Sequence, residues 1–227
     1  KSNKKTIVSI FVNPKQFNNV KDFNSYPANI KKDLAVLKKI KKLDFVYVPT
    51  FSDVYENKRK SKIKIKKKYK ILCAKFRKGH FEGVLDVMNK LTKLIKPNKI
   101  FMGKKDFQQF ILVKDYIKKK YNIKVIGCPS IRDNNKVPLS SRNLLLNKRQ
   151  LSIASQIIKD LFNFKNEFRK SRKIDHNLKI KKDELQKKYK IKIEYLENRK
   201  INNLKKTNTL NKSKIFIAYY ISQVRLI

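Results

Sequence analysis

The 227-residue chain has few of the residues that form sharp turns or reactive centres: four glycines, no tryptophan, two cysteines and two histidines. Cys73 and Cys128 share no motif spacing. Two cysteines with two distant histidines, His80 and His176, exclude the usual zinc-binding patterns. We therefore expect buried free thiols in a reducing compartment, and hence a cytoplasmic protein.

Long apolar runs are also absent, and none reaches the roughly 20 residues that a membrane-spanning helix needs. We therefore predict no membrane association. The opening "KSNKKTIVSIFV" resembles a signal peptide, but its apolar run is very short. Asn13 and Pro14 end that run without a small-residue cleavage site. We interpret residues 6–12 as a strand buried on both faces.

Acidic residues are scarce: 17 Asp and Glu face 59 Lys and Arg, which gives a net charge of +42. Such a charge attracts polyanions, but nucleic-acid-binding proteins concentrate it on one face or tail. Here lysine is spread along the chain together with abundant Ile and Asn, which we interpret as a bias toward A/T-rich codons. We predict no specific nucleic-acid partner. The dense stretch Lys58–Lys70, "KRKSKIKIKKKYK", keeps a basic nucleic-acid-binding protein as an alternative to a solvated loop.

Apolar residues, 41% of the chain, follow alternating strand and helix patterns in its first part. The patterns predict strands at residues 6–12, 44–48, 99–102 and 123–127, with helices starting at 30, 81 and 106. Alternation of this kind predicts an α/β fold with a parallel sheet. From about Leu139 the pattern becomes two helices and two strands, a smaller α+β unit without a Gly/Pro-rich linker. We predict two packed domains, 1–130 and 131–227.

Polar residues follow several of the predicted strands, where ligands of open α/β sheets bind. In "FMGKKDFQQF", Gly103-Lys104-Lys105-Asp106 forms a strand-to-helix turn suited to an anion. Asp106 is equally well explained as a helix N-cap. The adjacent Gln108 and Gln109 cannot share one helix face.

Three further stretches are candidates, each with a structural alternative. "PLSSRN", Pro138–Asn143, can wrap phosphate oxygens or simply cap a helix. "NPKQF", Asn13–Phe17, places two amides beyond the first strand or forms an Asx-turn. His80, between Gly79 and Phe81, is more often a structural hydrogen-bond partner than a catalyst, and no second histidine lies near it in the sequence.

Taken in order, "SIFVNPKQF", "DFNSYP", "RKGHFEGV", "FMGKKDFQQ", "PLSSRN", "IEYLE" and "VRLI" resemble the pantothenate synthetase family over essentially the whole chain. The resemblance implies a Rossmann-like nucleotidylyltransferase domain with a smaller C-terminal lid domain. It also implies a homodimer that condenses pantoate with β-alanine, using ATP and Mg²⁺ and forming a pantoyl-adenylate.

The resemblance also implies site residues. Gln16 and Gln109 would hold pantoate, with Gln16 also near β-alanine and His80 close by. ATP would contact Asn13, Gly103, Lys104, Lys105, Asp106, Ile131, Leu139, Ser140, Ser141 and Arg142. Of these, Lys105, Ser140, Ser141 and Arg142 would act on the phosphates, and Asp33 would lie on the Mg²⁺ side.

The sequence departs from the family pattern in places. The family's first strand and its His-x-Gly-His motif would precede Lys1, and the chain contains no such motif. Lys78 replaces a proline, and Lys104 a glutamate. The resemblance therefore implies that the chain as given is incomplete or inactive, and an inactive truncated homologue is the alternative.

Overall fold

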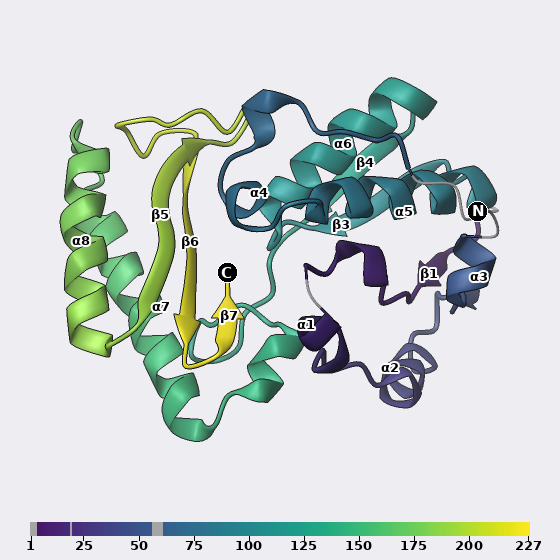
Figure 1. Ribbon diagram of the computed structural model, residues 1–227, viewed down its shortest axis with the longest axis horizontal. Helices are drawn as coiled ribbons and strands as arrows, with labels where there is room; N and C mark the ends of the chain where they lie inside the picture. The colour runs from purple at the N-terminus through teal and green to yellow at the C-terminus, as the bar shows by residue number, and fades with distance from the viewer. Residues whose placement is uncertain (1–3, 19, 56–60) are drawn as a thin grey trace.

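The computed structural model describes residues 4–18, 20–55 and 61–227. Helices and strands alternate in the first part, and an antiparallel sheet with two helices follows (Figure 1). The first part contains β1 (Ile7–Ser9), the 3₁₀ helix η1 (Pro14–Gln16), α1 (Val20–Asn24), α2 (Ile30–Leu37), β2 (Phe45–Tyr47), α3 (Phe51–Val54), η2 (Lys67–Tyr69), α4 (Cys73–Phe76), α5 (His80–Ile95), β3 (Lys99–Gly103), α6 (Phe107–Tyr121) and β4 (Lys124–Cys128). The second part contains η3 (Ser141–Leu145), α7 (Lys148–Glu167), α8 (Ile174–Tyr189), β5 (Lys192–Lys200), β6 (Ser213–Ile221) and β7 (Val224–Leu226).

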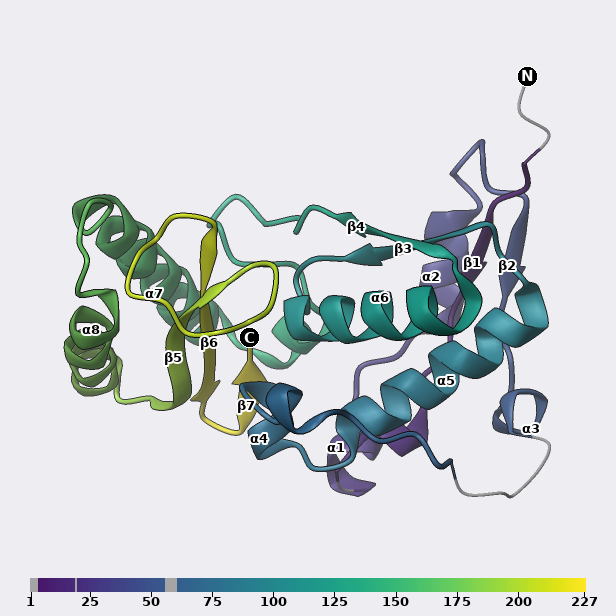
Figure 2. The same ribbon diagram turned by 90° about the horizontal axis from the view of Figure 1, so that it is seen from above.

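The parallel strands form two pairs in the described part of the chain. β1 pairs with β2, with Ile7 opposite Phe45, and β3 pairs with β4, with Lys99 opposite Lys124. In Figure 2 the β3–β4 pair lies alongside α6, and the β1–β2 pair lies at the right of the view. The predicted α/β class with a smaller second unit is therefore confirmed.

The prediction of a strand buried on both faces over residues 6–12 is wrong. β1 extends only over Ile7–Ser9, and the Ile7 side chain is 38% exposed. Among the described residues β1 pairs only with β2, so its other edge has no neighbouring strand and its apolar side chains stay partly in solvent. The predicted apolar stripe of the next helix also ends early, because α2 stops at Leu37 and Ile40 follows in a turn.

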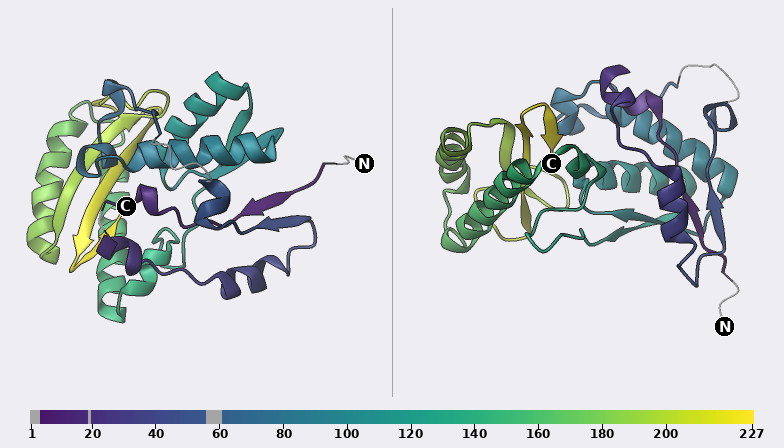
Figure 3. Two further views of the ribbon diagram at one scale, coloured as in Figure 1. Left: turned by 45° about the vertical axis from the view of Figure 1, so that its right-hand side comes forward. Right: turned by 90° about the horizontal axis from the view of Figure 1, so that it is seen from below.

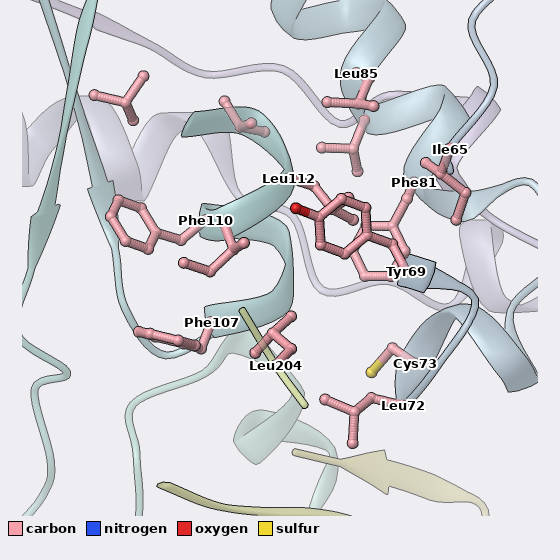
Figure 4. Close-up of a cluster of buried hydrophobic side chains, with 14 of the residues drawn as sticks. Ile65, Tyr69, Leu72, Cys73, Phe81, Leu85, Phe107, Phe110, Leu112 and Leu204 are labelled. Carbon is pink, nitrogen blue, oxygen red and sulfur yellow. The ribbon is translucent and has the colours of Figure 1, made fainter. Parts of the chain in front are cut away.

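Helices α5 and α6 supply most of the core of the first part, as their apolar periodicity predicts. Phe81 and Leu85 of α5 pack with Phe107 and Phe110 of α6. Figure 4 shows these side chains together with Tyr69, Leu72 and Cys73 from the segment that precedes α5. This packing fixes the N-terminal ends of both helices, to which His80 and Asp106 belong.

The second part is an antiparallel sheet in the order β5-β6-β7, lying between the α7–α8 pair and the first part (Figure 2). A reciprocal capping box of Asn147 and Gln150 starts α7. The short strand β7 was not predicted, and it returns the C-terminus to the middle of the molecule (Figure 3). Arg225 thereby reaches the junction of the two parts.

The two parts pack against each other as expected for a second unit without a flexible linker. Tyr195, Leu204 and Ala218 belong to the same apolar cluster as α5 and α6. A division at residue 130 stays a prediction. In the described residues we find no helix that has the length and apolarity to cross a membrane.

Candidate active site

Two adjoining cavities, of 270 Å³ and 310 Å³, lie at the junction of the two parts. Both are lined by Arg77, His80, Lys105, Asp106, Gln109, Pro138, Ile158 and Ile227. The first cavity extends toward Tyr195 and Phe216. The second extends toward Gln16, Arg142 and Arg225, so it gathers side chains from distant parts of the sequence.

Gln16 is held at the second cavity by its backbone. His80 Nδ1 lies 2.7 Å from the Gln16 carbonyl oxygen, and the Arg77 guanidinium donates to the same oxygen at 3.2 Å. Asn13 caps η1, which ends at Gln16, so the turn after β1 delivers this residue to the site. The amide side chain of Gln16 makes none of these contacts and is available to a ligand.

His80 is a neutral hydrogen-bond relay in this arrangement. Burial, and then the positive charge of Arg77, lower the pKa of His80 from 6.5 to about 4. Nδ1 therefore carries the proton donated to Gln16, and Nε2 accepts from Arg77 at 3.1 Å. A histidine that stays neutral and has both nitrogens engaged is a positioning group, which agrees with the structural alternative given for it above.

The turn between β3 and α6 presents its charged side chains to the cavities. The Lys104 backbone N–H donates to the Cys128 carbonyl, which fixes the turn against the end of β4. Asp106 occupies the N-cap position of α6, but its side chain makes no capping hydrogen bond. Its carboxylate instead lies 3.9 Å from Lys105 Nζ, and both residues line both cavities.

The two adjacent glutamines have different surroundings. Gln108 is buried, and its amide nitrogen donates to the carbonyls of Tyr69 and Ile71, which braces the segment before α4. Gln109 lines both cavities, whereas Gln108 reaches only the first. This difference matches the expectation from their angular separation on a helix.

The Ser140–Asn143 segment closes another side of the second cavity. The Ser140 hydroxyl accepts from the Arg142 backbone N–H. Ser141 donates to the Tyr26 hydroxyl at 2.9 Å, and the Arg142 guanidinium lies 2.8 Å from the Asp22 carboxylate. The segment therefore both caps η3 and presents the Ser140 hydroxyl and the Arg142 cation at the second cavity.

Several residues expected at the site line neither cavity. Asn13 is fully buried and bonds the Gly83 carbonyl and the Tyr55 hydroxyl, which makes it part of the packing beneath η1. Its side chain also accepts from the Lys15 N–H, the Asx-turn given as the alternative. Asp33 is exposed in the first turn of α2. The remaining residues of this kind are Gly103, Ile131, Leu139 and Ser141.

The dense basic stretch lies away from this chemistry. Lys58–Lys60 fall outside the described residues, and the described lysines from Lys62 to Lys70 line neither cavity. Within the described ranges, no group of three or more His, Cys, Asp or Glu side chains could hold a metal ion. The polar side chains at the cavities are cations, amides, hydroxyls and the Asp106 carboxylate, set among apolar side chains.

Two arginines at the site were not predicted. Arg77 stands in "RKGHFEG", a stretch noted only for His80, and Arg225 stands in the terminal "VRLI". Arg225 bonds the Glu194 carboxylate at 2.6 Å and the Cys73 sulfur at 3.4 Å. One signal in the sequence could have identified them: each arginine stands in a stretch that the sequence analysis had already singled out. Charge alone could not, because the chain has 59 lysines and arginines.

The fold and the cavities together define an α/β protein with two cavities, lined in part by cationic side chains, between a parallel-strand region and a smaller antiparallel sheet. A profile of the pantoate-beta-alanine ligase family matches residues 1–227. The chain belongs to this ligase family.

Individual relatives are similar over most of the chain. A pantothenate synthetase of Sulfurihydrogenibium is 34% identical, with 100% of this chain and 82% of the relative covered. A bifunctional pantoate ligase/cytidylate kinase of Prochlorococcus marinus is 39% identical over 89% of this chain, which spans only 40% of that protein. The crystal structure of the Francisella tularensis pantoate-beta-alanine ligase, complexed with beta-gamma ATP and beta-alanine, has a TM-score of 0.80 and 33% identity, and covers 99% of this chain and 78% of that one.

Proposed function

We propose that the protein condenses pantoate with β-alanine in two steps that use ATP. The observation that carries the proposal is the second cavity, where Gln16, Gln109, Lys105 and Arg142 meet in a chain of the pantoate-beta-alanine ligase family. The ATP and β-alanine named for the Francisella relative support the same substrates.

In the first step, a pantoate carboxylate oxygen bonds to the α-phosphorus of ATP, and pyrophosphate leaves with the bridging oxygen. Two anions must approach each other, so catalysis depends on positioning and on cations near the developing charge. Lys105 and Arg142 supply those cations, with Ser140 and Ser141 as hydroxyl donors. Gln16 and Gln109 bond the hydroxyls and carboxylate of pantoate. We keep Asn13, Gly103, Lys104, Asp106, Ile131 and Leu139 as proposed ATP contacts, of which only Lys104 and Asp106 line a cavity.

In the second step, the amine of β-alanine attacks the acyl carbon of the pantoyl-adenylate. The bond between that carbon and the AMP oxygen breaks, AMP leaves, and the nitrogen releases a proton to solvent. No protein nucleophile is required because the mixed anhydride is already activated. His80 holds Gln16 in place and moves no proton.

Mg²⁺ belongs to the proposal only as the ion that accompanies the ATP phosphates. In nucleotide sites it is usually held by phosphates with one or two carboxylates. Asp33, the expected carboxylate, lines neither cavity, so the described residues do not form a metal centre and we assign no step to the ion. The homodimer and the cytoplasmic location also stay predictions.

The proposal is tested with labelled pyrophosphate and purified protein. Pantoate-dependent exchange of pyrophosphate into ATP reports the first step, and β-alanine-dependent release of AMP reports the second. Absence of both activities, with the protein folded, would overturn the proposal and favour the inactive homologue. Binding of DNA that falls steeply with salt and leaves pantoate unused would favour the nucleic-acid alternative.

A further inference from the structure

The second cavity is lined by four cationic side chains: Arg77, Lys105, Arg142 and Arg225. Three of them have a carboxylate close by. Arg142 pairs with Asp22, Arg225 pairs with Glu194, and Lys105 lies 3.9 Å from Asp106. In the described part of the chain, no carboxylate lies within ion-pair distance of Arg77.

The guanidinium of Arg77 is instead surrounded by neutral acceptors. It donates to His80 Nε2 at 3.1 Å, to the Gln16 carbonyl at 3.2 Å and to the Asn18 side-chain oxygen at 3.3 Å. These three contacts hold the planar group rigidly at the cavity wall. The guanidinium carries five N–H donors, so these three contacts leave one N–H on each terminal nitrogen for a bidentate anion.

The charges around Arg77 also favour an incoming anion. Burial, and then the nearby positive charge of Arg225, lower the pKa of Arg77, and Arg142 acts in the same direction, while Cys73 and Asp22 oppose the shift without reversing it. The charged form of a half-buried cation among other cations is stabilised when a ligand brings a negative charge. Arg142 and Arg225 each form an ion pair, whereas Arg77 forms none with the described residues, although the Asp22 carboxylate still favours its charged form from beyond ion-pair distance.

We propose that Arg77 binds the carboxylate of the acceptor amino acid, β-alanine, and so selects an acceptor with an acid group. The inference rests on the proposed function and deepens it. Of the two acids in that reaction, pantoate loses its charge when its carboxylate becomes the mixed anhydride. The carboxylate of β-alanine stays ionised through both steps and needs a cation that the phosphates do not occupy.

The position of Arg77 fits this role. It bonds the backbone of Gln16, the residue expected to hold pantoate and also to lie near β-alanine. An acceptor anchored by its carboxylate at Arg77 would direct its amine into the cavity, toward the acyl carbon held by Gln16 and Gln109. Arg77 acts on orientation and affinity and touches no bond that forms or breaks.

The test compares the wild-type protein with Arg77→Gln and Arg77→Lys, using β-alanine and its neutral analogue β-alaninamide as acceptors. Lys75→Gln is the matched control, since it removes one positive charge two residues away at an exposed side chain that lines neither cavity. We expect wild type and the control to prefer the acid. Arg77→Gln should reduce the preference, measured as the ratio of kcat/KM values, by about 10- to 100-fold, mainly through the KM for β-alanine. Arg77→Lys should give an intermediate ratio.

Pantoate-dependent pyrophosphate exchange separates this role from the alternatives. We expect exchange in Arg77→Gln to stay within about twofold of wild type, because β-alanine takes no part in the first step. Equal losses with acid and amide would show a structural role and overturn the inference. An exchange rate that falls as far as the use of β-alanine would place pantoate or phosphate at Arg77 and overturn it as well.

Direct binding keeps the inference testable if the proposed reaction is not observed. Calorimetric titration with β-alanine should show binding to wild type and to Lys75→Gln, and weaker binding by about 10-fold or more to Arg77→Gln. This result would support the carboxylate site even where exchange and AMP release are both absent. No β-alanine binding to wild type, or equal binding to all variants, would overturn it.

Discussion

The guanidinium of Arg142 lies 2.8 Å from the carboxylate of Asp22, 120 residues earlier in the chain. Beside this pair, Ser141 donates to the Tyr26 hydroxyl. The segment proposed to hold the ATP phosphates is therefore tied to the region around α1, across the second cavity. The Asp22 carboxylate already pairs with the Arg142 guanidinium, so the proposed binding of ATP phosphates there would compete with Asp22.

Replacing Asp22 by Asn should therefore tighten ATP binding. The variant keeps the shape of the side chain and removes the competing charge. Because the pair is partly exposed, with side-chain exposures of 23% and 26%, the expected gain is about 0.5–1 kcal/mol, or about two- to fivefold in Kd by calorimetry. Asp160→Asn is the control, since it breaks a comparable pair with Lys188 between α7 and α8, away from the cavities. Weaker ATP binding to Asp22→Asn would show that the pair positions Arg142 for the nucleotide.

Substitutions of Lys105 and Gln109 should affect the two substrates of the first step differently. Lys105→Ala should mainly lower the rate of pantoate-dependent pyrophosphate exchange, by about 10-fold or more, because a cation near the phosphates is lost. Gln109→Ala should mainly raise the KM for pantoate, by several-fold, because a neutral hydrogen bond to the substrate is lost. Lys118 is exposed near the end of α6, the helix that contains Gln109. Lys118→Ala should leave both the exchange rate and the KM for pantoate unchanged. Unchanged kinetics in both site variants would refute these assignments.

His80 should make the stability of the protein depend on pH between about 6.5 and 4. Its pKa is lowered to about 4 in the folded state, first by burial and then by Arg77. On acidification the unfolded chain binds a proton near pH 6.5 and the folded chain only near pH 4, so protonation stabilises the unfolded state in that window. Stability from this group is therefore complete above pH 6.5 and is lost as the pH falls.

The measurement is the free energy of unfolding from urea titrations at several pH values. The difference between wild type and His80→Gln should shrink by up to about 3 kcal/mol from pH 7 to pH 4, at about 1.4 kcal/mol per pKa unit. His176→Gln, at an exposed position of α8, should retain the wild-type dependence. If the difference in unfolding free energy between wild type and His80→Gln stays constant with pH, the pKa of His80 is the same in the folded and unfolded states.

The parts of the fold that the sequence predicted well are those in which local periodicity and core packing agree. Val84, Val87 and Leu91 form a stripe that defines α5, and the structure buries all three. Residues 6–12 have the composition of a buried strand, but burial depends on neighbouring strands that a local pattern does not contain. The same limit explains β7, whose three residues become a strand only through pairing with β6.

The candidate site shows a similar division. The turn at Lys105–Asp106 was predictable because a strand, a glycine and a helix start adjoin there. Arg77 was not, because its significance comes from three contacts, with Gln16, Asn18 and His80, and from the pairing of the other cations. A chain with 59 basic residues gives no local signal that singles out Arg77, the cation of the second cavity for which the described residues show no ion pair.

Gly83 provides a test in which helix propensity and packing give opposite signs. Glycine inside a helix is less favourable than alanine by about 0.5–1 kcal/mol, so propensity alone predicts that Gly83→Ala stabilises α5. The added Cβ would lie 2.3 Å from the Lys15 carbonyl oxygen, which is backbone and cannot rotate away. We expect a net loss of about 1–3 kcal/mol in urea unfolding, together with weaker use of pantoate, because η1 and Gln16 must move. Gly103→Ala, where a Cβ meets nothing within 4 Å, should change stability by less than about 0.5 kcal/mol. A stabilised Gly83→Ala protein would show that η1 does not pack this closely on α5.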